Sequence, residues 1–91
     1  MNLETIRNEI DEVDIKLADL LIKRMNCSKE IAIIKKEDNL PIFIPEREKE
    51  ILEKLKNLDE NYGDYLCDIY KTVFEVSRDL QFSVLSSKDS E

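Results

Sequence analysis

The 91-residue chain contains one glycine, two prolines, no tryptophan and no histidine. Because glycine and proline, the residues that most favour turns, are so few, the sequence argues against a β-sandwich, a β-barrel or a glycine-rich phosphate loop. Without histidine, the chain lacks the commonest metal ligand and the commonest general base. Its two cysteines, Cys27 and Cys67, do not have the spacing of a zinc site or a disulfide framework. We therefore expect a protein without metal or cofactor, with reduced thiols, in the cytoplasm.

The charge balance narrows the choice of partners. Twenty-one acidic and 14 basic residues give a net charge of −7. Such a surface repels nucleic acid and anionic membranes, because both are negatively charged and bind to positively charged protein surfaces. The chain also shows neither a signal peptide nor an apolar stretch long enough to span a membrane. We expect no nucleic-acid partner and no membrane association.

The longest apolar pattern runs with heptad spacing from Leu3 to Ile34. The helix that it predicts ends before Pro41, because the residue preceding a proline avoids helical angles. A helix of ~35 residues is roughly 50 Å long, whereas a compact domain of this size is only about 30 Å across. The rest of the chain is therefore too small to cover the apolar side of this helix along its whole length. We therefore expect a homodimer in which two such helices pair in antiparallel fashion.

Two further helical patterns follow. One begins at Pro45, a favoured first helical position, and extends to Leu55 or Leu58. The other covers about residues 64–85, and residues 86–91 form a polar tail. The sequence thus predicts one all-α domain over residues 1–91, ordered over about 3–85, with a long, a short and a long helix.

Polar side chains occupy positions where these patterns call for apolar ones. Arg24 lies in the heptad seam, and Lys35, three turns later, faces within about 20° of it. Glu48 falls on the apolar stripe of the second helix, and Ser77 and Gln81 continue a stripe of the third. Taken singly, these residues have ordinary explanations, such as an ion pair between Arg24 and Glu48. Together, inward-facing cations indicate a bound anion, because unpaired buried charge is unfavourable.

Arg7 lies beside the same seam, 17 residues before Arg24, or roughly 25 Å along a straight helix. One small ligand cannot touch both from a single chain. In an antiparallel dimer, however, Arg7 of one copy approaches Arg24 and Lys35 of the other. The spacing therefore predicts two composite pockets per dimer, each suited to a small dicarboxylate that carries a hydroxyl.

Five motifs resemble those of the all-α, type II chorismate mutases over roughly residues 3–85. They are Leu3-x-x-Ile6-Arg7-x-x-Ile10-Asp11-x-x-Asp14, Leu20-Leu21-x-x-Arg24, Ile31-Ala32-x-x-Lys35, Pro41-x-x-x-x-x-Arg47-Glu48 and Glu75-x-Ser77-x-x-x-Gln81. The resemblance implies a monofunctional enzyme of aromatic amino acid biosynthesis that rearranges chorismate to prephenate. It also implies an intertwined homodimeric helical bundle without a cofactor.

The resemblance also implies roles for individual residues. Lys35 and Gln81 match the donors to the ether oxygen of chorismate. Arg24 matches the carboxylate clamp within the chain, and Arg7 the clamp supplied by the other subunit. Glu48 matches the acceptor for the ring hydroxyl.

Three more positions match the wall of the pocket. Ser77 and Arg47 match polar positions, with Arg47 expected to act through water or through Glu48. Ile44 departs from the pattern, because many relatives carry there an aspartate that caps the second helix. We expect its backbone to line the pocket without a side-chain cap.

Two alternatives stay open at this point. An isochorismate pyruvate lyase of the same fold would use the same cationic pocket. A helical dimerisation module would instead direct its inward cations at acidic residues of a partner, and it would have no catalytic activity to lose.

Overall fold

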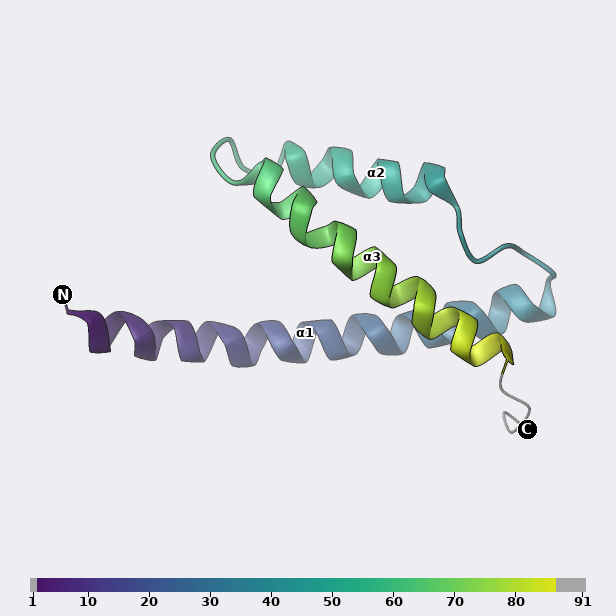
Figure 1. Ribbon diagram of the computed structural model, residues 1–91, viewed down its shortest axis with the longest axis horizontal. Coiled ribbons are helices and arrows are strands. Elements are labelled where there is room, and N and C mark those ends of the chain that lie inside the picture. Colours follow the sequence, from purple (N-terminus) through teal and green to yellow (C-terminus); the bar gives the residue numbers. More distant parts are fainter. Residues whose placement is uncertain (1, 87–91) are drawn as a thin grey trace.

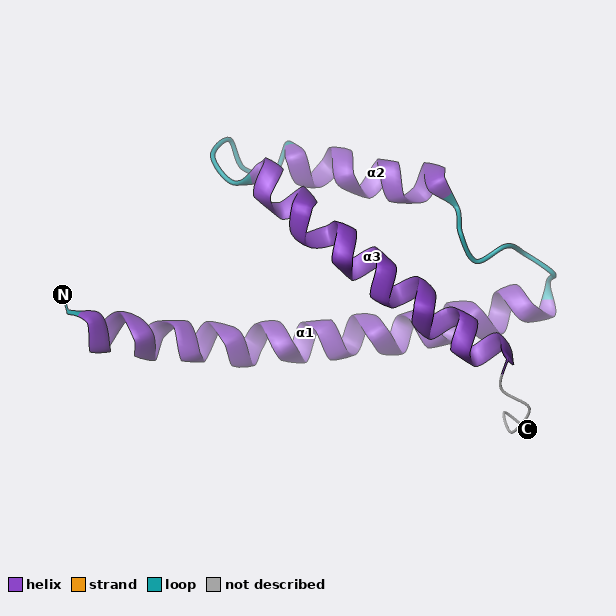
Figure 2. Cartoon of the chain, viewed as in Figure 1, coloured by secondary structure: helices purple, strands orange, loops and turns teal. Residues whose placement is uncertain are grey.

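The computed structural model describes residues 2–86 and consists of three helices joined by short connections (Figures 1 and 2). They are α1 (Leu3–Glu37), α2 (Pro45–Lys56) and α3 (Gly63–Ser86). The described part of the chain has no strand, so the predicted all-α order of long, short and long helices is confirmed. Of the expected polar tail, residues 87–91 lie outside the described residues.

Local side-chain chemistry accounts for the ends of α1 and the start of α2. Asn2 caps α1, because its Oδ1 accepts a hydrogen bond from the backbone N of Thr5 at 2.9 Å. Beyond the end of α1, Asn39 adopts a left-handed φ of 54°, which asparagine tolerates better than most residues. Pro45 begins α2 as predicted, and the preceding Ile44 makes no side-chain cap.

The turn between α2 and α3 depends on one carboxylate and on the single glycine. Oδ1 of Asp59 accepts hydrogen bonds from the backbone N atoms of Asn61 and Tyr62, each at 2.8 Å. A Cβ on Gly63 would lie 2.1 Å from the carbonyl oxygen of Lys56. Glycine therefore permits the end of α2 to approach the start of α3 this closely.

Helix α3 packs against both α1 and α2, and within residues 2–86 the latter two do not pack on each other. The N-terminal half of α1 extends past α3, and no other helix of residues 2–86 covers it (Figure 1). The chain measures 53 × 29 × 14 Å, and its radius of gyration is 16.5 Å, against about 12 Å for a compact domain of this length. No helix among these residues is long and apolar enough to cross a bilayer.

Little apolar surface is buried within one chain. Among the described residues, only Ala32, Ile42 and Phe74 are buried hydrophobic side chains. Along α1 the exposed large hydrophobic side chains include Leu3, Ile6, Ile10, Val13, Leu17 and Leu20. The seam predicted to pair with a second copy is therefore uncovered in the single chain.

Candidate active site

A cavity of about 270 Å³ lies where the three helices meet the connection between α1 and α2. Its lining residues are Arg24, Cys27, Ser28, Ile31 and Lys35 of α1, Ile42 and Ile44 of the connection, Arg47, Glu48 and Ile51 of α2, and Phe74, Ser77, Arg78 and Gln81 of α3. Every site residue predicted from the sequence belongs to this lining except Arg7. Helical periodicity thus brings together side chains that are as many as 57 positions apart, from Arg24 to Gln81.

Arg24 is held against aromatic rings. Its guanidinium carbon lies 5.5 Å from the centroid of the Tyr70 ring and 5.8 Å from that of Phe74. Cation–π attraction of this kind orients the guanidinium without neutralising its charge. Among residues 2–86, Arg24 forms no salt bridge, so the alternative in which Glu48 is its ion-pair partner is not realised. Its positive charge remains available to a ligand.

Lys35 lies half-buried at the other side of the cavity. Its Nζ donates a hydrogen bond to the carbonyl oxygen of Ile42 at 2.7 Å. Desolvation by burial lowers the pKa of Lys35 from its ordinary value of 10.5. An ammonium group has three N–H donors, so two remain for other acceptors.

A chain of hydrogen bonds crosses from α1 to α3 beside these cations. The hydroxyl oxygens of Ser28 and Ser77 lie 2.7 Å apart, and Nε2 of Gln81 donates to Oγ of Ser77 at 3.1 Å. The Oε1 atom of Gln81 is buried and has no hydrogen-bond partner within the described residues. An unpaired buried amide oxygen is unfavourable by about 1–3 kcal/mol, which favours either a bound donor or a half-turn of the amide that brings Oε1 to the hydroxyl of Ser77.

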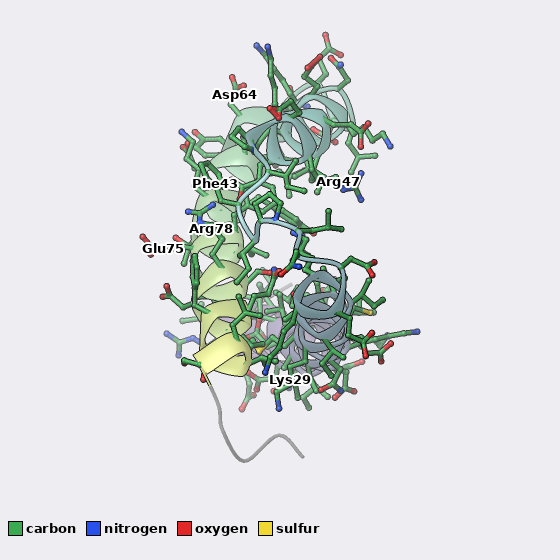
Figure 3. All side chains as sticks on the ribbon, turned by 90° about the vertical axis from the view of Figure 1, so that its right-hand side faces the viewer. Lys29, Phe43, Arg47, Asp64, Glu75 and Arg78 are labelled. Carbon is green, nitrogen blue, oxygen red and sulfur yellow. The ribbon has the colours of Figure 1, made fainter. Side chains whose placement is uncertain are left out.

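The carboxylate of Glu48 pairs with Arg78 of α3, whereas Arg47 pairs with Glu50 on the exposed side of α2. Among these residues Arg47 forms no ion pair with Glu48, because consecutive helical side chains diverge by about 100°. Its action through water stays a prediction. Figure 3 shows Arg47 on the opposite side from Arg78, which lies beside Phe43. Arg47 borders the cavity, but its guanidinium is directed at Glu50.

Sequence reasoning missed Arg78 and Ser28. Arg78 directly follows Ser77 and is one of many charged residues, so periodicity alone does not distinguish it. Ser28 is four residues after Arg24, which places it on the same face of α1. That spacing is a signal from which it could have been identified.

The two remaining predicted positions differ from the rest. At Ile44 the backbone carbonyl accepts hydrogen bonds from the backbone N atoms of Arg47 and Glu48, at 3.1 and 3.3 Å. The backbone of this residue therefore starts α2 without a side-chain cap. Arg7 lies on the exposed N-terminal half of α1, outside the cavity of its own chain.

Comparisons with known proteins identify relatives of this chain. Residues 6–82 match the family described as chorismate mutase type II. The chain is 36% identical over 85 residues to the chorismate mutase of Methanocaldococcus jannaschii, covering 87% of this chain and 83% of that protein. It is 39% identical to the bifunctional chorismate mutase/prephenate dehydratase of Aquifex aeolicus, covering 87% of this chain but only 24% of that protein's length.

One solved structure is similar over almost the whole chain. It is the crystal structure of chorismate mutase from Helicobacter pylori in complex with prephenate. The match has a TM-score of 0.84 and 42% sequence identity, and it covers 93% of this chain and 94% of that one.

Proposed function

The chain belongs to the type II chorismate mutase family, and from this premise we propose that it rearranges chorismate to prephenate. The observation that carries the proposal is the convergence of Arg24, Lys35, Glu48 and Gln81 on one cavity. A relative with 42% identity and the same fold has been crystallised with prephenate, which supports the same ligand class here.

The proposed reaction is an intramolecular rearrangement of a dianion, and it needs no nucleophile or general base. Catalysis then consists of holding the substrate folded and stabilising the charge that develops on its ether oxygen as the C–O bond breaks. Lys35 donates to that oxygen with the N–H groups that Ile42 does not use. Gln81 is the second donor, once a half-turn of its amide lets Ser77 donate to Oε1 and directs Nε2 at the ligand.

The remaining groups of the pocket bind the substrate. Arg24 clamps one carboxylate, and Glu48 accepts the hydrogen bond of the ring hydroxyl. Arg47, Ser77 and Ile44 form the wall.

We further propose that the second carboxylate binds Arg7 of the partner subunit in an intertwined homodimer. The uncovered apolar seam of α1 supports this assembly, as does the distance of Arg7 from the cavity of its own chain. The dimer would then hold two identical composite sites. We also propose that residues 1–91 act as one domain, in the cytoplasm, without a cofactor.

Turnover of chorismate tests this function directly. Purified protein incubated with chorismate should consume it and form prephenate, and incubation with isochorismate should release little pyruvate. Arg24→Ala should lower kcat/KM by about a hundredfold or more, while its circular dichroism stays helical. Pyruvate release from isochorismate without chorismate turnover would assign the lyase activity instead. A folded protein that leaves both substrates unchanged would contradict the proposal.

A further inference from the structure

Arg78 makes the half-buried ion pair of the cavity. It joins α3 to Glu48 in the first turn of α2, and the two side chains are 29% and 23% exposed. Salt bridges between fully exposed groups contribute little, because water screens them and the side chains lose entropy. The partial burial of this pair distinguishes it from the two ion pairs on the helix surfaces, Arg47 with Glu50 and Lys71 with Asp68.

The same guanidinium also contacts the connection between α1 and α2. The carbon at its centre lies 5.0 Å from the centroid of the Phe43 ring, and Figure 3 shows the two side chains next to each other. On the α1 side, Lys35 holds the carbonyl oxygen of Ile42. Two cations from different helices thus attach the connection to the cavity wall.

This attachment matters because α2 begins without a side-chain cap at Ile44. Glu48 is in the first turn after that uncapped start, so its position depends on how the connection is held. Arg78 contacts Oε2 of Glu48. A carboxylate has two oxygens that accept hydrogen bonds, and this contact leaves Oε1 for another donor.

We propose that Arg78 is a positioning residue, which orients the carboxylate of Glu48 so that its free oxygen accepts the ring hydroxyl of the substrate. The inference rests on the proposed function, and it assigns Arg78 no direct contact with the substrate. Its consequence is specific. Arg78 contributes to binding only through Glu48, so its effect disappears when that carboxylate is removed.

A double-mutant cycle between these two residues tests the proposal. Arg78→Met should raise KM about tenfold and leave kcat within about twofold, because a hydroxyl contact present in both ground and transition states changes binding more than rate. Arg78→Lys keeps a cationic donor to Glu48 but loses the planar guanidinium over Phe43, so its KM should lie between those of wild type and Arg78→Met. In the Glu48→Gln background, Arg78→Met should change kcat/KM by less than about twofold.

Two controls separate this role from a general effect on folding. Lys71→Met removes an exposed ion pair on the same helix, away from the cavity, and should leave kcat and KM unchanged. Thermal unfolding followed by circular dichroism reports the stability of every variant. The positioning role would be overturned if Arg78→Met left kcat and KM unchanged, or if it lowered kcat/KM by the same factor in the Glu48→Gln background as in wild type. In either case, wild-type turnover of chorismate would leave the proposed function intact. Wild-type protein that does not convert chorismate would overturn both.

Discussion

The hydroxyl oxygens of Ser28 and Ser77 lie 2.7 Å apart across the contact between α1 and α3. Ser28 is buried, and Ser77 is in turn the acceptor for the amide of Gln81. A serine hydroxyl has one proton, so the partner that Ser28 provides influences which way the hydroxyl of Ser77 points. That direction in turn decides whether Gln81 meets a donor or an acceptor.

Replacing Ser28 by alanine should therefore affect catalysis. We expect Ser28→Ala to lower kcat about threefold to tenfold, because the hydroxyl of Ser77 then rotates freely and the amide loses its fixed orientation. The free energy of unfolding should fall by about 1 kcal/mol. Steady-state kinetics and thermal unfolding measure the two effects. Ser83→Ala, an exposed site on α3, is the matched control. A loss of stability with unchanged kcat would make Ser28 purely structural.

The neutral amide of Gln81 determines the expected pH dependence of kcat/KM on the acidic side. A neutral amide donates without taking up a proton, so wild-type kcat/KM should be nearly flat from mildly acidic to neutral pH. In Gln81→Glu the new carboxyl donates only when protonated, so kcat/KM should fall about tenfold per pH unit above its pKa. Gln81→Ala should show a loss that does not vary with pH over this range. A steep rise of wild-type activity towards acid would contradict the role of the amide.

The ammonium group of Lys35 determines the expected pH dependence of kcat/KM on the alkaline side. Its pKa is lowered by burial, so the ammonium loses its proton at a lower pH than an exposed lysine does. Since the protonated form is the proposed donor to the ether oxygen, kcat/KM should begin to fall, as the pH is raised, before the pH reaches 10.5, the ordinary pKa of lysine. Lys35→Arg stays protonated throughout, so this decline should disappear, although the overall rate will be lower. An identical alkaline decline in Lys35→Arg would assign it to another group.

Subunit complementation tests the composite site. Arg7→Ala and Arg24→Ala should each be nearly inactive alone. When equal amounts are unfolded together and refolded, half of the dimers are mixed, and each mixed dimer regains one intact site. Turnover should therefore recover to about a quarter of the wild-type value. Mixing Arg24→Ala with Lys35→Ala, both from the same side of the site, should restore nothing. The absence of recovery in the first mixture would place Arg7 outside the site.

Gly63 predicts a loss of stability remote from the cavity. A Cβ at this position meets the carbonyl oxygen of Lys56 at 2.1 Å, and backbone cannot move aside as a side chain does. Gly63→Ala should lower the free energy of unfolding by roughly 1–3 kcal/mol, with kcat of the folded protein unchanged. Glu60→Ala in the same turn should stay within about 0.5 kcal/mol of wild type. Chemical denaturation measures both, and an unchanged Gly63→Ala would contradict the close approach.

Much of the fold follows from local signals in the sequence. The start of α2 at Pro45 was predicted to the residue, because proline fixes φ and lacks an N–H. Apolar periodicity predicts α1, and the isoleucine at position 44 predicts that α2 begins without a side-chain cap. These features depend on neighbours in the chain, which is why sequence alone reveals them.

Contacts between helices were harder to predict. The pairing of Glu48 with Arg78 depends on the angle at which α3 crosses α2, and no local pattern determines that angle. Similarly, Arg24 faces the cavity as periodicity predicts, but its position over Tyr70 and Phe74 depends on helix packing.

Because one face of α1 is uncovered in the single chain, we expect the stability of the fold to depend on the protein concentration. In the proposed homodimer, folding and association would form a single bimolecular equilibrium, because so few apolar side chains are buried inside one chain. The unfolding midpoint then rises with protein concentration. Dilution would melt the helices and withdraw Arg7 from the neighbouring pocket in one step, so activity per chain would decline together with helicity.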